Sequence, residues 1–156
     1  MHTVRRATEG DIPAIMDLLV QVNMVHHNGR PDLFRGPTTK YSPDELKAIL
    51  PDDSRPVFVC VDGSGRVLGH GFCVLEHSGG RLMEAHDTIY IDDICVDAAA
   101  RGRGVGRALW DHILTFARQK GCYNVTLNVW CCNPGAMKFY EKLGLKPYKV
   151  GMETIL

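Results

Sequence analysis

The sequence predicts one α/β (α+β) domain, over residues 1–156, in which a mixed β-sheet carries helices on both faces. Its 156 residues match the length of a single domain, and no internal repeat, low-complexity tract or linker divides them. Apolar residues recur at helical spacing in some segments and alternate with polar residues in others. The predicted order is helices, hairpin, strand, helix, strand, helix and strand, which favours a sheet covered on both sides.

The N-terminal third is predicted to be helical. Asp11 can cap a helix that has Pro13 in its first turn. An apolar stripe follows at helical spacing: Ile12, Ile15, Met16, Leu19 and Val22. From Met24 to Tyr41 this pattern gives way to a polar loop, and loops of that length are often functional. Ser42 to Glu45 form a capping box, which predicts a short second helix ending near Leu50.

The middle of the chain is predicted to form strands. Val57 to Val61 and Val67 to Leu75 are rich in β-forming residues and flank a turn at Asp62 to Gly65, so they predict an antiparallel hairpin. A further strand is predicted from Thr88 to Val96.

The C-terminal part is predicted to alternate helices and strands. A helix is indicated by Leu109, Ile113, Phe116 and Ala117. Gly121 ends this helix, and Val125 to Trp130 then alternate as a strand. Asn133 caps another helix, which ends at Gly144, and a last strand is predicted from Tyr148 to Leu156.

Composition excludes several classes of protein. Lys plus Arg and Asp plus Glu number 18 each, so no net charge attracts nucleic acid or an anionic membrane. No secretory signal or membrane-spanning run is present, and we expect a cytoplasmic protein. The six cysteines lack the paired spacing of a zinc site, so we expect reduced core thiols and no metal. Only the adjacent Cys131 and Cys132 raise a redox interpretation, which the geometry of a disulfide disfavours.

The strongest local motif is the loop from Arg101 to Gly106, between a predicted strand and a predicted helix. Glycines let successive backbone N–H groups approach a ligand, and the helix N-terminus adds a partial positive charge. Such a turn suits a phosphate or pyrophosphate, and Arg101, Arg103 and Arg107 add cations around it.

Other phosphate-binding folds use similar turns. A P-loop requires Lys and then Ser or Thr after its last glycine, whereas Arg107 and Ala108 follow here. A dinucleotide fingerprint tolerates Ala108 as its third small residue, but it also requires further βα units, and the upstream hairpin disfavours them. A structural turn that needs glycine only for its backbone angles stays an alternative.

The loop and its surroundings resemble the GNAT superfamily of N-acetyltransferases, whose cofactor signature is Arg or Gln, two residues, Gly, one residue, then Gly or Ala. Arg101, Gly104 and Gly106 match that signature in register. The resemblance covers nearly the whole chain, including Val4 to Thr8 with Asp11, Ile94 to Asp97, and Asn133 to Leu145.

The resemblance implies a mostly antiparallel sheet in which the strand of Ile94 to Val96 diverges from the strand of Leu127 to Trp130. Acetyl-CoA would lie in the gap, with one backbone N–H near Ile94 to Val96 polarising the thioester carbonyl. The residues so assigned to the cofactor are Ile94, Cys95, Val96, Arg101, Gly102, Arg103, Gly104, Val105, Gly106, Arg107, Asn133 and Tyr140.

The reaction that the resemblance implies needs a base and an acid. An alkyl amine is protonated at pH 7, so a carboxylate must take its proton, and Asp92 and Asp93 are the candidates. Successive strand residues face opposite sides, so we expect only one of them in the cleft. The resemblance favours Asp92, and a bulge would reverse the facing. Tyr140 is the candidate acid for the leaving thiolate.

The acceptor is expected to be a small-molecule or peptide amine. Residues 24–41, including His26, His27 and Arg30, and residues 76–87 are expected to shape its pocket. Some relatives that acetylate protein N-termini carry Glu where Asn128 stands, which weakens that acceptor class. Homodimers are common among relatives, and the resemblance extends that analogy to this chain.

Two other functions stay open at this point. A non-catalytic module that senses acyl-CoA would need the loop but neither carboxylate nor phenol. A nucleotide-binding protein would bind NAD or ATP at the same loop.

Overall fold

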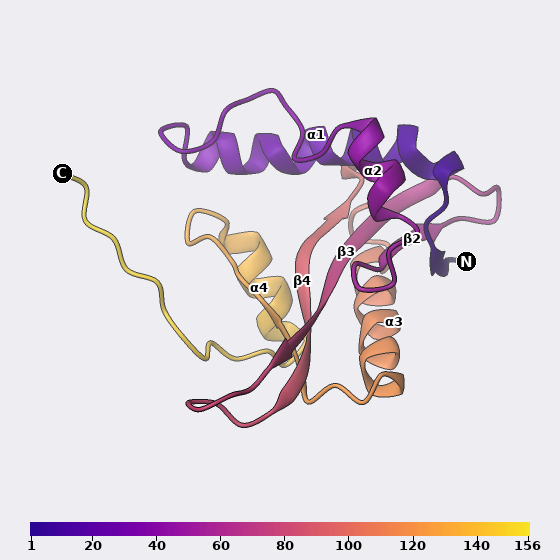
Figure 1. The fold of residues 1–156 in the computed structure, drawn as a ribbon. Helices are drawn as coiled ribbons and strands as arrows, with labels where there is room; N and C mark the ends of the chain where they lie inside the picture. The colour runs from indigo at the N-terminus through magenta and orange to yellow at the C-terminus, as the bar shows by residue number, and fades with distance from the viewer.

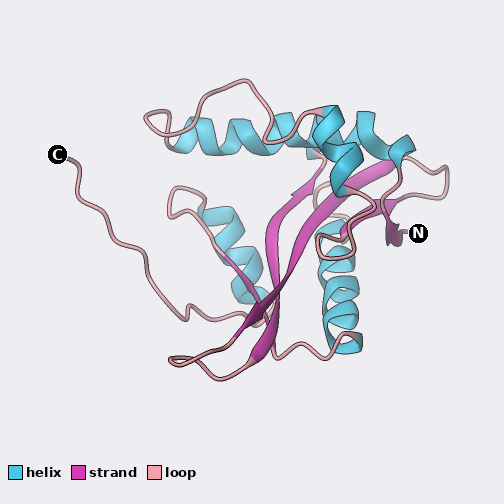
Figure 2. Ribbon diagram, in the orientation of Figure 1, coloured by secondary structure: helices cyan, strands magenta, loops and turns pink.

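Five strands form one open sheet in the order β1-β2-β3-β4-β5, in a computed structural model that describes every residue from 1 to 156. The strands are β1 (Thr3–Arg6), β2 (Val57–Val61), β3 (Val67–Ser78), β4 (His86–Val96) and β5 (Asn124–Leu127). Neighbouring strands are antiparallel except β4 and β5, which are parallel. The mixed, mostly antiparallel sheet is therefore confirmed (Figure 2).

Helices cover both faces of this sheet, as predicted (Figure 1). The α-helices are α1 (Ile12–Gly29), α2 (Pro43–Ile49), α3 (Val105–Gln119) and α4 (Pro134–Lys142), and the two short 3₁₀ turns are Glu9–Asp11 and Ala98–Ala100. One apolar cluster joins α1 and α2 to the sheet. A second cluster joins α3 to the opposite face, with Leu143 and Leu145 after α4 packed against it.

Strand β2 contributes side chains to both apolar clusters. All five of its residues are buried, and their side chains alternate between the two faces. Val57 and Val59 belong to the cluster under α1 and α2, whereas Phe58 and Cys60 belong to the cluster under α3. A strand covered on both faces needs an unbroken apolar run, which is the pattern in this sequence.

Two predicted helix starts are confirmed by local hydrogen bonds. Ser42 Oγ accepts from the Glu45 backbone N–H at 3.1 Å, and Asn133 Oδ1 accepts from Ala136 at 3.2 Å. Asp11 was predicted to cap α1, but its carboxylate instead accepts from Arg5 and from the Thr8 backbone N–H. The Asp11 side chain therefore does not cap α1. It ties β1, through Arg5, to the turn that precedes α1.

Three predicted boundaries are wrong. The loop expected from Met24 begins only after Gly29, because α1 continues through His26 and His27. Strands β3 and β4 run beyond the predicted limits to Ser78 and from His86, since long antiparallel strands keep pairing until the turn.

The last predicted strand, Tyr148 to Leu156, is absent, because the chain after α4 forms no secondary structure and pairs with no strand of its own sheet. This segment leads away from the body of the protein (Figure 1). Strand β5 is likewise shorter than predicted and ends at Leu127, because β4 provides no partner beyond that point.

The sequence predicts that the cysteines are reduced thiols in the core. All six cysteines are free thiols, and Cys60, Cys73 and Cys95 are buried in strands as predicted. Burial raises the pKa of both Cys73 and Cys95 to about 12, so neither thiol is a ready nucleophile.

None of the helices has the length and apolar character that crossing a bilayer requires.

Candidate active site

Strands β4 and β5 separate about halfway along β4. Their pairing ends with Ile91 opposite Leu127, so residues 92–96 have no strand partner on the β5 side. On the other side, the Asp97 backbone N–H donates to the Leu68 carbonyl at 2.8 Å. Because backbone groups alternate between the two sides of a strand, those of Ile94 and Val96 face the opening.

Cys95 has a different position from its two neighbours. By the same alternation its backbone groups face β3, and its buried thiol contacts the Leu18 carbonyl of α1 at 3.4 Å. Of the three residues that the resemblance assigned to the cofactor on this strand, Ile94 and Val96 can therefore offer backbone groups to a ligand. Cys95 joins the strand to α1.

A cleft of about 620 Å³ occupies this opening. It is bounded by α1 and the segment after it, by β4, by residues 127–130 and by α4. The predicted site residues that line it are Asp92, Asp93, Ile94, Asn133 and Tyr140. The strand separation thus brings the candidate base, the candidate acid and the free strand edge to one place.

Both carboxylates line this cleft, which corrects the expectation that only one of them could. Asp93 lies opposite Phe72 and Ile91 lies opposite Cys73, so Asp92 is an extra residue without a partner on β3. Such a β-bulge interrupts the alternation of side chains along the strand. The bulge therefore allows Asp92 and Asp93 to reach the same cleft.

Asp92 is engaged by an ion pair and a phenol. Its two oxygens lie 2.7 and 2.6 Å from Lys40 Nζ, and the Tyr41 hydroxyl donates to it at 3.2 Å. Burial alone would lower the pKa of Lys40, but the hydrogen bond and charge of Asp92 outweigh it and raise that pKa. Arg55 donates in turn to the Tyr41 hydroxyl at 3.1 Å. The Asp92 carboxylate is thus already occupied by neighbouring donors.

Asp93 has one donor and one free oxygen. His70 Nε2 lies 2.7 Å from Asp93 Oδ2, and no other side chain or backbone group of the protein bonds to this carboxylate. A carboxylate can only accept, so in this hydrogen bond an ionised Asp93 requires the tautomer of His70 that has its proton on Nε2. Asp93 remains 12% exposed toward the cleft while the His70 side chain is fully buried. A buried ring thus fixes one oxygen and leaves the other open to a ligand.

His70 is a residue that sequence reasoning missed. It stands on β3 among apolar residues, between Gly69 and Gly71, and contacts Phe72 edge to face at 4.9 Å between ring centres. Its Nδ1 is buried without a partner. The available signal was one polar ring inside an otherwise apolar strand that pairs with the strand of the two aspartates.

Tyr140 is held in the protonated state. Burial, and then the negative charge of Asp93, raise the pKa of this phenol well above its ordinary value of about 10. The phenol lines the same cleft as Asn133, two helical turns away on α4, as their spacing predicted. A phenol that keeps its proton at neutral pH is available as a hydrogen-bond donor or acid.

The glycine-rich loop needs its glycines for different reasons. Gly102 and Gly104 adopt left-handed conformations with φ of 76° and 80°, which other residues rarely adopt. Gly106 serves packing instead, because a Cβ there would lie 2.9 Å from the Phe139 ring of α4. Val105 buries its side chain in the core, so only its backbone can reach a ligand. The loop leads directly into the N-terminus of α3.

The three loop arginines differ in their partners. Arg107 is paired with Asp111 one turn along α3 at 3.0 Å. Arg101 and Arg103 are exposed and form no ion pair. These two side chains are therefore the cations that stay free for a phosphate.

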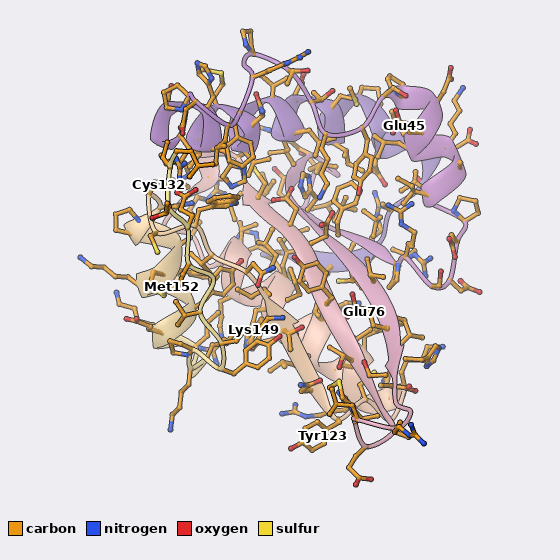
Figure 3. The ribbon with its side chains drawn as sticks, turned by 60° about the vertical axis from the view of Figure 1, so that its left-hand side comes forward. Glu45, Glu76, Tyr123, Cys132, Lys149 and Met152 are labelled. Atoms are coloured by element: carbon orange, nitrogen blue, oxygen red, sulfur yellow. The ribbon has the colours of Figure 1, made fainter.

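Of the two segments expected to shape the acceptor pocket, one lines the cleft. His26 of α1, and Phe34, Arg35 and Lys40 after it, line the cleft, where Phe34 packs against Trp130. None of residues 76–87 lines it. The β3–β4 hairpin carries those residues away from α1, as the position of Glu76 in Figure 3 indicates.

Comparison with known proteins places this geometry in a family. The model of the Acetyltransferase (GNAT) family matches residues 24–145, so the chain belongs to that family. Among curated proteins it is similar to glucosamine 6-phosphate N-acetyltransferase 1 of Oryza sativa, with 41% identity over 110 residues that cover 70% of this chain and 62% of that protein. It is also similar to the glucosamine 6-phosphate N-acetyltransferase of Trypanosoma brucei brucei, with 32% identity over 100 residues.

The same fold is present in a solved structure. A mutant of the BH1408 protein from Bacillus halodurans superposes with a TM-score of 0.94 at 29% identity, over 99% of both chains. The alignments span only 62% and 63% of the length of the two curated relatives named above.

Proposed function

We propose that this protein is an acetyl-CoA-dependent N-acetyltransferase that transfers an acetyl group to a primary amine by direct attack. The observation that carries the proposal is the meeting, in one cleft, of a free strand edge, a carboxylate with an open oxygen and a protonated phenol. A module that only sensed acyl-CoA would need the strand edge and the loop, but not Asp93 and Tyr140.

The donor site fits an acyl-CoA. The left-handed loop at Gly102 and Gly104, the N-terminus of α3 and the unpaired Arg101 and Arg103 would bind its pyrophosphate. The unpaired edge at Ile94 and Val96 would bind the pantetheine arm through backbone groups. When bound, acetyl-CoA supplies a thioester that an amine can attack. A dinucleotide domain would instead need a mostly parallel sheet, whereas three of the four strand pairs here are antiparallel.

Asp93 is the better-placed base of the two candidates. It has a free oxygen, whereas Lys40 and Tyr41 occupy the oxygens of Asp92. Asp93 would take the proton of the acceptor ammonium, directly or through water. Asp92 would then hold the wall of the acceptor site in place through Lys40.

Tyr140 would give its proton to the departing thiolate. Its raised pKa means that the phenol still carries this proton at the pH at which the amine is being deprotonated. Asp93 raises that pKa through its charge, so the two groups influence one another.

A small amine is the acceptor class that the relatives support. Two of them are named for acetylating glucosamine 6-phosphate, a small amino sugar. Asn128, where some N-terminal acetyltransferases carry Glu, donates to the Tyr90 hydroxyl at 3.2 Å on the cleft wall. We infer a small-molecule or peptide amine as the acceptor.

Calorimetric titration with acetyl-CoA, with NAD and ATP as controls, tests the donor first. One-to-one binding of acetyl-CoA alone is expected. Binding of NAD or ATP in its place would contradict the assignment of the loop. Thiol release with a panel of amines then separates the enzyme from a sensor, because a sensor would bind acetyl-CoA and release no thiol above background with any amine.

The loop cations give a further prediction. Arg101→Ala and Arg103→Ala should each raise the Kd for acetyl-CoA roughly tenfold, because each removes a charge-assisted contact to phosphate. Arg118→Ala, in the last turn of α3, is the matched control and should leave the Kd unchanged. Equal effects in all three variants, or a loss that persists with pantetheine fragments lacking phosphate, would rule out the loop as the phosphate site.

A further inference from the structure

The register of β3 and β4 places His70 and Asp93 on the same face of the sheet. Phe72 stands opposite Asp93, and His70 stands opposite Cys95. Residues directly opposite one another point to the same face, and a diagonal neighbour two residues away is within reach of a long side chain. The pairing of these two strands therefore brings the His70 ring to the Asp93 carboxylate, with Nε2 2.7 Å from Oδ2.

The His70 ring is held in a fixed position. Its side chain is fully buried and contacts Phe72 edge to face, and the Phe72 ring in turn stacks on Tyr41 with 5.5 Å between ring centres. Helix α1 lies across β3 and β4 and covers this region (Figure 1). Because neighbouring rings enclose it, the imidazole presents its Nε2 to Asp93 in one orientation.

Packing alone does not account for a histidine at this position. The other residues of β3 from Val67 to Phe72 are apolar or glycine, so an apolar side chain would suit the surroundings. The Nδ1 atom of His70 is buried without a hydrogen-bond partner, and such an atom lowers stability. The ring nitrogen that does have a partner is Nε2, and its partner is the candidate base. The presence of this ring is therefore explained by Asp93.

The hydrogen bond to His70 decides which oxygen of Asp93 faces the cleft. Oδ2 accepts from Nε2, whereas Oδ1 has no partner in the protein and stays accessible. The torsion that turns a carboxylate has only broad preferences, so an unrestrained carboxylate would adopt many orientations. Proton transfer requires one of them, and a small displacement of a reacting group lowers the rate strongly.

We propose that His70 is a positioning residue for Asp93, whose Oδ2 it holds inside the sheet so that Oδ1 is directed at the acceptor ammonium. Oδ1 takes one proton from the ammonium, and the nitrogen keeps the electron pair with which it attacks the thioester. The bond between His70 and Oδ2 persists throughout, and the buried ring touches neither substrate. This inference rests on the proposed function, in which Asp93 is the base.

Variants of His70 test this role. His70→Leu removes the donor and keeps a side chain that suits the core, so turnover with an alkyl amine should fall about tenfold or more. The Kd for acetyl-CoA should change less than about threefold, because the ring does not line the cleft. His70→Gln keeps an N–H donor and should recover most of the lost turnover. His112→Leu removes a half-buried histidine of α3 outside the cleft and, as the matched control, should leave turnover unchanged.

Either of two results with these variants would overturn the inference. One is a turnover of His70→Leu within about twofold of the unmodified protein, because a lost positioning contact has a larger effect. The other is an equal loss in His70→Gln, because a restored donor should restore the orientation of Asp93.

A double-variant cycle separates positioning from a structural role. Asp93→Asn removes the group through which His70 acts, so adding His70→Leu to it should lower turnover by less than about twofold. A histidine that only stabilised the fold would cause its full loss in both backgrounds, which would contradict the inference. If Asp93→Asn lowers turnover and His70→Leu does not, only the role of His70 is lost. If Asp93→Asn leaves turnover unchanged, the proposed base is wrong and the role of His70 with it.

Nitrogen NMR of the imidazole tests the contact in the unmodified protein. At neutral pH, Nε2 of His70 should carry a proton, and this proton should exchange slowly with solvent because the ring is fully buried. The test does not depend on whether His70→Leu folds. An Nε2 without a proton could not donate to an ionised Asp93, so that result would overturn the inference.

Discussion

Replacing Tyr140 with phenylalanine is expected to lower the turnover of acetyl transfer by about a hundredfold or more, the range of a lost general acid. The Kd for acetyl-CoA should change less than about threefold, because the ring that packs in the cleft is retained. The two quantities are measured by thiol release at saturating substrates and by calorimetry. A loss in turnover without a loss in binding is the result that separates an acid from a packed aromatic residue.

Tyr90→Phe is the matched control, since it removes a phenol from the same cleft that bonds only to Asn128. Its turnover should stay near that of the unmodified protein. The direction of the pKa shift adds a second test. Because the pKa of Tyr140 is raised, the phenol keeps its proton at and above its ordinary pKa of about 10, so turnover should not fall on its account as the pH rises from 8 through about 10. Unchanged turnover in Tyr140→Phe would remove this residue from the mechanism.

The sequence predicts those parts of the fold that are decided by near neighbours. The caps at Ser42 and Asn133 form as expected, because each needs only an N–H three residues further along the chain. The strand predicted over residues 148–156 does not form, because a strand needs a partner and no sequence pattern names one. Alternating apolar residues indicate a preference for the extended state, and tertiary contacts decide whether it is paired.

Some features of the candidate site can likewise be predicted from the sequence, and others cannot. The conformation of the loop from Arg101 to Gly106 can be predicted because left-handed backbone favours glycine, which Gly102 and Gly104 supply. The arrangement of the aspartates is not readable, because a bulge at Asp92 depends on how β3 and β4 align. His70 is equally hidden, since its contact with Asp93 joins two strands whose register no local pattern fixes. Its recognition required the structure.

Asp93→Asn is expected to lower turnover with an alkyl amine by about a hundredfold or more, the contribution of a positioned base. The amide keeps the size of the side chain and can still contact His70, but it cannot take a proton. Asp92→Asn should have a much smaller effect on turnover and a larger effect on the KM for the amine, because it loosens Lys40 and Tyr41 at the wall of the cleft. Steady-state kinetics of both variants measure the difference.

Acceptor amines of different pKa test whether Asp93 acts as a base. An acceptor of low pKa, such as an arylamine, is already neutral at pH 7 and needs no base before it attacks. The defect of Asp93→Asn should therefore shrink with such an acceptor, whereas a variant that merely distorts the cleft would be impaired with both. An equal defect with both amines would make Asp93 a structural residue. A larger loss of turnover in Asp92→Asn would transfer the role of base to Asp92 and show that Lys40 leaves its carboxylate when the acceptor ammonium arrives.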